Sequence, residues 1–267
     1  MKSLSVLVVA TVLVTAADQV PNQDVFRQSD GTMCGMEGTA TGPDAKALDR
    51  LKNRWKNAPA AEDIDTNVSL AAMLAPGEDE NRFDSAKGAQ VSGFVIDVKV
   101  GGKETCNCKA TAPIDRDTHI ELALANDAPK NQRVIAEVTP RLRAQMKAKD
   151  VDWTTDALRA AIKGKWVKVT GLLLFDSMHF GEAENTNPGG ANNWRATCWE
   201  IHPITSLEVL DSRPPGTTEL PAVVLKEFHR AHVLQLQRAP ERREALENRK
   251  KKILMGFERT DLDEEVP

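Results

Sequence analysis

The fold is decided by the stretch Gln90-Val91-Ser92-Gly93-Phe94-Val95-Ile96-Asp97-Val98, in which two sets of residues alternate with a period of two. This period places successive side chains on opposite faces of a β-strand. Gly101-Gly102 follows and offers a tight hairpin turn into a second predicted strand, from Lys103 to Thr111. We therefore expect the chain to enter a β-sheet near Gln90.

A helix interrupts the strands that are predicted farther along the chain. These strands cover residues 117–125, 133–139, 165–175, 194–201 and 205–210. Thr154 or Thr155 caps the start of the helix, and Gly164 ends it. Leu158 and Ile162 form its apolar face, so the helix is expected to pack on the sheet.

The order of these elements predicts the fold class. Three strands, a helix and then further strands is the order of the five-stranded OB barrel, in which the helix lies between the third and fourth strands. We predict a mainly β (α+β) fold, a small OB-like Greek-key β-barrel with flanking helices, over residues 89–211. Another small, mainly β barrel with a similar number of strands is the alternative.

The segments on either side of the predicted barrel have a different character. Residues 18–88 are predicted to be a loose N-terminal lead-in, a short helix over residues 44–57 and a linker rich in Pro, Gly and acidic residues over residues 58–88. Residues 212–267 are predicted to be a basic helical segment that ends in an acidic tail.

The first 17 residues have the pattern of a secretory signal. Lys2 precedes an apolar run from Leu4 to Val14, and the small residues Thr15-Ala16-Ala17 follow. This run is shorter than the roughly 20 residues of a membrane-spanning helix, and no later segment comes closer. We expect cleavage after Ala17, a periplasmic or extracellular location, and no transmembrane segment in the mature chain.

Four cysteines are compatible with two disulfides in an exported chain. Cys106 and Cys108 lie two apart in a segment that is predicted to be extended, so each is expected to pair with Cys34 or Cys198 rather than with the other. Free or partly buried thiols are the alternative. The spacing of Cys106-Asn107-Cys108 is shorter than that of usual zinc ligands.

Histidines and carboxylates gather on the predicted barrel strands. Asp117, His119 and Glu121 lie on one face of an alternating strand, whose apolar face is assigned to the barrel interior. Glu200 and His202 share one side of a later strand. Because the third and fifth strands of an OB barrel are neighbours, we expect the two groups to meet on a common surface. Carboxylates and imidazoles that converge in this way suit a divalent metal or acid–base chemistry.

The sequence predicts a site for a divalent metal ion, zinc or another transition metal. Its predicted ligands are His119, His179, His202, Asp117 and Asp176. Asp176 and His179 lie at the mouth of a long Asn- and Gly-rich loop, which is a candidate functional loop. If the site is catalytic, Glu200 or Glu121 is the base and Arg195 stabilises an anion. The alternative is a solvated strand face with surface ion pairs.

The same residues carry a resemblance. The pattern reads Asp117-Thr118-His119-Ile120, Ile135-Ala136-Glu137, Val167-Lys168-Val169-Thr170-Gly171, Phe175-Asp176-Ser177-Met178-His179 and Glu200-Ile201-His202-Pro203. Over residues 90–210 it resembles a largely uncharacterised family of exported bacterial proteins. The resemblance implies a single β domain and export, without an activity, and Glu137 in this pattern is a further candidate for the site. The loop from Glu184 to Asn193 is longer here than in that family.

Two functions from different classes follow from these predictions. The first is an exported binding module that holds a divalent metal, a small polar ligand or a protein partner. The second is a metal-dependent hydrolase of phosphoesters or related bonds, which lacks the support of a nucleophile motif or a phosphate loop. Nucleic-acid binding is disfavoured, because the chain has no Tyr and its net charge is −4.

Overall fold

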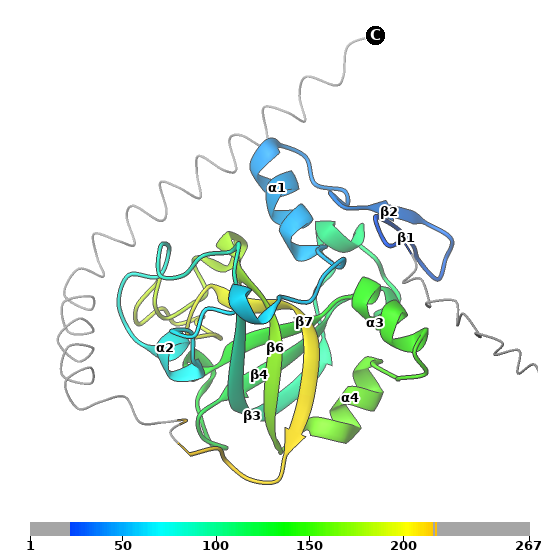
Figure 1. The fold of residues 1–267 in the computed structure, drawn as a ribbon. Coiled ribbons are helices and arrows are strands. Elements are labelled where there is room, and N and C mark those ends of the chain that lie inside the picture. Colours follow the sequence, from blue (N-terminus) through cyan, green and yellow to red (C-terminus); the bar gives the residue numbers. More distant parts are fainter. Residues whose placement is uncertain (1–21, 216, 218–267) are drawn as a thin grey trace, which may run out of the picture.

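Five strands of the computed structural model close into a barrel, with helix α1 (Pro43–Lys52) at one end (Figure 1). The structure describes residues 22–215 and 217. The barrel strands are β3 (Gly88–Val100), β4 (Thr118–Ala123), β5 (Val134–Val138), β6 (Trp166–Phe175) and β7 (Trp199–Leu210). They follow the order β3-β4-β5-β7-β6 around the barrel, and the β5–β7 pair is parallel. This is the order of an OB barrel, so the predicted mainly β, OB-like fold is confirmed.

The alternation in β3 builds one wall of the barrel interior. Val91 and Val95 are buried in the core, as the period of two predicts. A shift of register between Val95 and Asp97 then changes the phase of the alternation. As a result Val98, rather than Asp97, joins the core, and the strand can pair with both β4 and β6.

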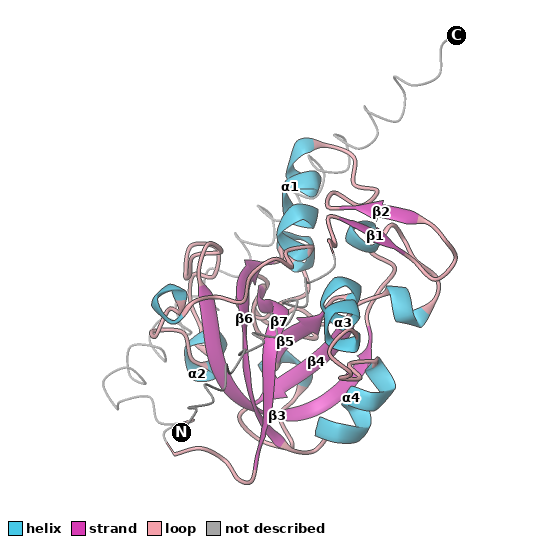
Figure 2. Cartoon of the chain, turned by 45° about the vertical axis from the view of Figure 1, so that its right-hand side comes forward, coloured by secondary structure: helices cyan, strands magenta, loops and turns pink. Residues whose placement is uncertain are grey.

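Two helices lie between β5 and β6, which Figure 2 shows beside the barrel: α3 (Pro140–Lys147) and α4 (Thr155–Ile162). The Thr154 hydroxyl caps α4 by accepting a hydrogen bond from the backbone N–H of Ala157. Gly164 follows the helix with φ of 77°, a left-handed conformation that glycine adopts without strain. Leu158 and Ile162 pack into the core, so the predicted helix is confirmed.

The N-terminal segment is fixed to the barrel. It contains a two-stranded sheet of β1 (Val25–Arg27) and β2 (Met33–Gly35), followed by α1. The buried guanidinium of Arg141, on α3, donates hydrogen bonds to the carbonyls of Gln23, Cys34 and Gly35 and to the side chain of Asn53. The predicted loose lead-in is therefore wrong, because one buried arginine fixes several points of this segment at once.

Residues 58–88 also belong to the barrel and do not form a linker. Helix α2 (Leu70–Leu74) places Leu70 and Met73 in the hydrophobic core. The prediction failed because a short apolar patch among Pro, Gly and acidic residues was enough to cover the barrel. Helix α1 ends at Lys52, rather than at the predicted Asn57.

The predicted second strand, Lys103 to Thr111, is a loop. The backbone takes left-handed φ angles at Cys108 and Lys109, which a strand cannot accommodate. Short 3-10 helices occupy Ala61–Asp63, Thr105–Asn107, Pro113–Asp115, Lys130–Gln132 and Ser177–His179. Consequently β4 is the second strand of the barrel and β5 the third.

One disulfide joins Cys34 to Cys108. This bond agrees with the prediction that Cys34 pairs with one cysteine of the Cys106-Asn107-Cys108 stretch. The predicted second disulfide is wrong, since Cys106 and Cys198 are free, buried thiols.

The predicted signal at residues 1–17 lies outside the described residues, as does nearly all of the predicted C-terminal segment. Within the described part of the chain, no helix has the length and apolar character needed to cross a membrane.

Candidate metal centre

The outer face of three neighbouring strands carries the candidate site. Ile120 of β4 points into the core, which leaves His119 on the outer face. His119 pairs in register with Glu137 of β5, and Ile135 of β5 lies opposite Glu200 of β7. Strand β5 therefore lies between β4 and β7, and the carboxylate of its Glu137 lies between the two predicted groups.

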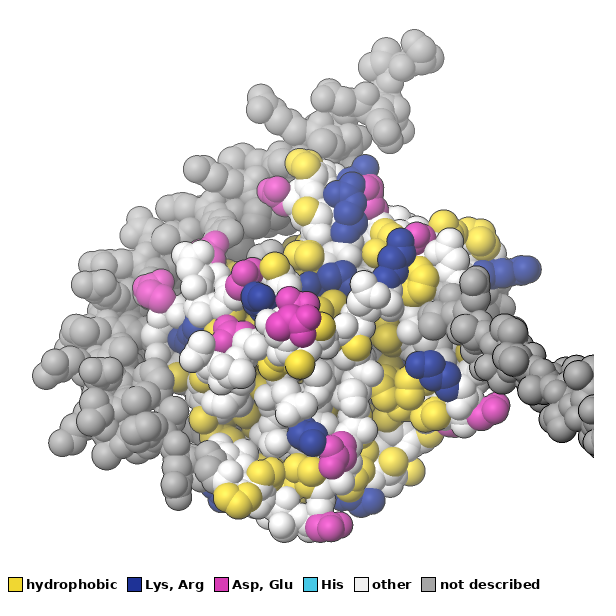
Figure 3. All heavy atoms as spheres, viewed as in Figure 1, with side chains coloured by type: hydrophobic (Ala, Val, Ile, Leu, Met, Phe, Trp, Pro, Cys, Tyr) yellow, Lys and Arg dark blue, Asp and Glu magenta, His cyan; other side chains and the backbone are white. Residues whose placement is uncertain are grey.

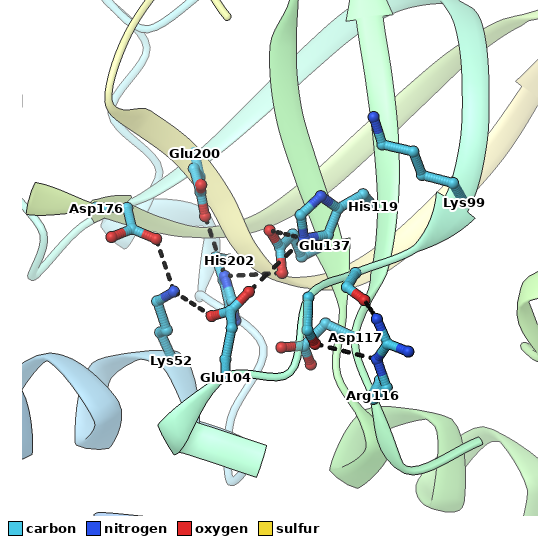
Figure 4. Close-up of polar contacts among 12 residues, drawn as sticks. Lys52, Lys99, Glu104, Arg116, Asp117, His119, Glu137, Asp176, Glu200 and His202 are labelled. Atoms are coloured by element: carbon cyan, nitrogen blue, oxygen red, sulfur yellow. Dashed lines mark hydrogen bonds and ion pairs between the residues drawn. The ribbon is translucent and has the colours of Figure 1, made fainter. Parts of the chain in front are cut away.

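Glu137 is the centre of the site, with one imidazole near each of its oxygens (Figure 4). Its Oε1 lies 2.9 Å from Nε2 of His119, and its Oε2 lies 3.5 Å from Nδ1 of His202. The same Nδ1 lies 3.1 Å from Oε2 of Glu200. Asp117, Glu137 and His202, here called the inner group, each place a donor atom within 4.8 Å of the others.

Side chains from outside the barrel bury this face. Lys52, the last residue of α1, places Nζ 2.5 Å from Oε2 of Glu104 and 2.6 Å from Oδ2 of Asp176. The Lys52 side chain is 4% exposed and the Asp176 side chain is fully buried. A buried ammonium group requires such close counter-charges. Lys52 thus ties α1 to the loop before β4 and to the end of β6.

Both central imidazoles hold their protons strongly in the protein without a metal ion. Burial disfavours the charged form of His119, but Glu137 and Glu104 together outweigh this effect and raise the pKa to about 10. Burial likewise opposes the proton on His202, and Glu137 together with Glu200 raises its pKa to about 9. Any cation that binds these rings must displace those protons.

The carboxylates differ in their environments. Burial raises the pKa of Asp117 to about 6, and the charge of Glu137 adds to this effect. Burial also raises the pKa of Glu200, but Arg195, whose Nη1 lies 2.6 Å from Oε1, together with His202 and Lys52 lowers that pKa below its usual value. Lys52 similarly holds the pKa of Glu104 well below its usual value despite burial. Fixed cations therefore neutralise the two ends of the site rather than its middle.

Several buried polar atoms of the site have no hydrogen-bond partner among the described residues. Each member of the inner group contributes one: Oδ1 of Asp117, Oε2 of Glu137 and Nε2 of His202. Nε2 of His119 and Oδ2 of Asp176 also lack a hydrogen bond of good geometry, but each faces a charged group, Glu137 at 2.9 Å and Lys52 at 2.6 Å. Buried polar groups in proteins are nearly always paired, so this concentration at one place is typical of a ligand-binding site.

Three of the predicted metal ligands, Asp117, His119 and His202, meet around Glu137, whereas Asp176 and His179 are grouped with Glu200. Nδ1 of His179 lies 2.8 Å from Oε2 of Glu182, and its Nε2 lies 3.7 Å from Oδ2 of Asp176. Asp176, His179 and Glu200 also place donor atoms within 4.8 Å of one another. His179 is partly exposed and thus occupies the side of the site nearest the solvent.

Two of the predicted catalytic residues lie away from the central carboxylate. Glu121 forms ion pairs with Lys99 and with Arg133. Arg195 is fully buried and is held by Glu200 and by the carbonyl of Thr197, while its Nη2 has no hydrogen-bond partner among the described residues.

Sequence reasoning missed three residues of the site. Lys52 comes from the predicted short helix and Glu104 from a predicted strand, and their sequence context carried no signal of the site. Cys106 places Sγ 3.6 Å from Oε2 of Glu104 and 3.8 Å from Oδ2 of Asp117. Glu137 was signalled by its position on an alternating strand, yet it was left out of the predicted ligands.

A pocket of about 850 Å³ opens beside the site. Its lining includes His119 and Glu104 of the site, together with Trp194, Lys103 and Lys109. Because His119 lines this pocket, the pocket is the route by which a ligand would reach it. Figure 3 shows a face of the molecule on which acidic and basic side chains intermingle, and no histidine is visible among the described residues there.

Comparisons with known proteins do not identify the function. No family model matches the chain, and no curated protein matches it. Among solved structures it is similar to asparaginyl-tRNA synthetase from Pyrococcus horikoshii complexed with asparaginyl-adenylate, with 17% identity and a TM-score of 0.24. The match covers 72% of this chain and 33% of the synthetase chain, so this chain spans about a third of that length. So weak a similarity carries no argument, and the OB assignment rests on the strand order.

Proposed function

We propose that this protein binds a divalent metal ion through Asp117, Glu137 and His202. The observation that carries the proposal is the set of three atoms without a hydrogen-bond partner that this inner group contributes within a fully buried site. Each buried polar atom left without a hydrogen bond costs about 1–3 kcal/mol. One cation between the three side chains satisfies all three atoms at once.

The charge of the site supports the same proposal. The carboxylates of the site outnumber the cations that contact them: Glu104, Asp117, Glu137, Asp176 and Glu200 stand against Lys52 and Arg195. Negative charge is therefore in excess when the imidazoles are neutral. A divalent cation offsets this excess, and the neutral imidazole is the form that coordinates a metal.

The surroundings of His202 fit a metal-bound imidazole. Its Nδ1 faces Oε2 of Glu200 at 3.1 Å, which leaves Nε2 as the coordinating atom. A carboxylate that holds the other ring nitrogen commonly orients such a ligand. One imidazole nitrogen and two carboxylate oxygens suit zinc and other first-row transition metals.

Calorimetric titration tests this function. Zinc, manganese and nickel are titrated into metal-stripped protein at neutral pH, beside Asp117→Asn and His202→Gln. We expect tight binding of at least one ion, weakened by about 10- to 100-fold or more in either variant. Glu208→Gln removes an exposed carboxylate farther along β7 and should bind as the wild type does. Absence of binding, or equal binding by both site variants, contradicts the proposal.

A metal-dependent hydrolase of phosphoesters is the second candidate. The observation that favours it is the pocket, which reaches His119 and is also lined by Lys99 and Arg116. Cationic side chains beside a metal are what a phosphoester substrate requires. Metal-dependent hydrolysis of a chromogenic phosphodiester that disappears in Glu137→Gln would support an enzyme. Its absence across zinc, manganese and nickel would leave the binding function.

We further propose that the protein acts outside the cytoplasm, in the periplasm or the medium. The signal-like pattern of residues 1–17 and the Cys34–Cys108 disulfide support this location. N-terminal sequencing of the exported protein should find Asp18 as the first residue. Retention of Met1 in that fraction would contradict cleavage.

A further inference from the structure

Glu137 faces a second set of donors on the side away from the inner group. Glu104, His119 and Glu137, here called the outer group, also place donor atoms within 4.8 Å of one another. Oε1 of Glu137 is the oxygen near His119, whereas Oε2 is the oxygen near His202. A carboxylate whose two oxygens face different imidazoles has the arrangement of a bridging ligand.

His119 is held in a fixed position. The residue is 6% exposed, and its Nε2 lies 2.9 Å from Oε1 of Glu137 without a hydrogen bond of good geometry in the described part of the chain. The ring stacks against Trp194, with an interplanar angle of 13°. Gly101 also lies close to the ring, and an added Cβ there would come within 2.7 Å of Nε2. Glycine at this position therefore leaves room beside the coordinating atom.

Glu104 retains one oxygen for a ligand. Lys52 occupies Oε2 at 2.5 Å, and Oε1 lies 3.9 Å from Nε2 of His119. This separation is too long for a hydrogen bond. It is compatible with two donors that share a cation, since each would lie about 2 Å from zinc.

We propose that Glu104, His119 and Glu137 form a second cation position, so that Glu137 bridges two divalent metal ions. The proposal rests on the proposed function, because Glu137 belongs to both groups. Two-metal sites in enzymes typically hold their ions about 3.5–4 Å apart, a distance that one bridging carboxylate spans.

The second position also accounts for the pocket. The pocket is lined by His119 and Glu104 of the outer group, and Asp117, Glu137 and His202 are absent from its lining. The outer ion would therefore exchange with solvent more readily than the inner ion, and its open coordination positions would take an oxygen ligand such as water, a carboxylate or a phosphate.

Metal counting tests the second position. Full-length protein is stripped with a chelator, loaded with zinc alone, desalted and examined by native mass spectrometry. We expect two zinc ions per wild-type chain and one per chain in His119→Ala and in Glu104→Gln. Manganese-loaded wild-type protein should give the electron paramagnetic resonance spectrum of a coupled pair, and both variants that of a single ion. Glu208→Gln should match the wild type in both measurements.

The results separate the two proposals. One zinc ion in the wild type, with the same number in Glu104→Gln, overturns the second position and leaves the inner site. No zinc in the wild type overturns both. Circular dichroism identifies any variant that fails to fold, and the wild-type count and spectrum decide the question without a variant.

Discussion

Without a metal ion, the protein is expected to lose stability as the pH rises above neutrality. The pKa of His119 is about 10 and that of His202 about 9, because the surrounding carboxylates together outweigh the opposing effect of burial on both rings. An unfolded histidine has a pKa near 6.5. A raised pKa in the folded state stabilises the native protein fully below the unfolded pKa. That stabilisation is lost as the pH rises through the folded pKa.

The expected loss is large. Between about pH 7 and 8.5 the folded protein holds nearly two more protons than the unfolded chain, one on each ring. For each such proton, the free energy of unfolding falls by about 1.4 kcal/mol when the pH rises by one unit. The combined loss over that interval is about 3–4 kcal/mol, against a typical total stability of about 5–15 kcal/mol.

Urea unfolding followed by tryptophan fluorescence, in the presence of a chelator, measures this dependence. His119→Gln should show roughly half the slope with pH, since one of the two protons is gone. Glu208→Gln, outside the site, should keep the full slope. Excess zinc should remove the decline, because metal binding replaces both protons. A constant free energy of unfolding across the interval would refute the reasoning, since it would mean that the buried rings are neutral.

Three further predictions concern the packing around the site. Gly101→Ala should weaken zinc binding while the protein stays folded, because the added Cβ displaces the ring of His119; calorimetry and circular dichroism measure the two effects. Removing the disulfide with Cys34→Ser should lower the free energy of unfolding by about 2–5 kcal/mol in urea, and a loss that Cys108→Ser fails to reproduce would contradict this. Arg141→Ala should expose the N-terminal segment to limited proteolysis while leaving the barrel resistant; an unchanged digestion pattern would show that other contacts hold the segment.

The barrel was predictable because its strands carry a local signal. The alternation around Val91 and the helix ending near Gly164 are set by near neighbours in the sequence. The loop from Lys103 to Thr111 was not predictable in this way. Its shape depends on the disulfide to Cys34 and on the left-handed backbone conformation of Cys108 and Lys109. Neither residue type indicates that conformation in a sequence.

The site was predictable only in part, for the same reason. His119 and His202 stood out because histidine is rare in this chain and each lies near carboxylates on an alternating strand. The misplaced second strand hid the fact that Glu137 lies between them. Lys52 and Glu104 enter the site through long-range contacts between α1 and the loop before β4, and such contacts leave no periodic trace in the sequence.

The Cys34–Cys108 bond has a consequence for the order in which the protein matures. It links positions 74 residues apart and fastens the loop that carries Glu104 to the N-terminal sheet. The donors on the barrel strands are set by strand pairing alone, whereas the outer position is complete only when that loop is in place. Zinc counts on reduced and oxidised protein should therefore differ by the outer ion. Oxidative folding would then come before full metal loading, and the redox state of the compartment would decide how many ions the protein carries.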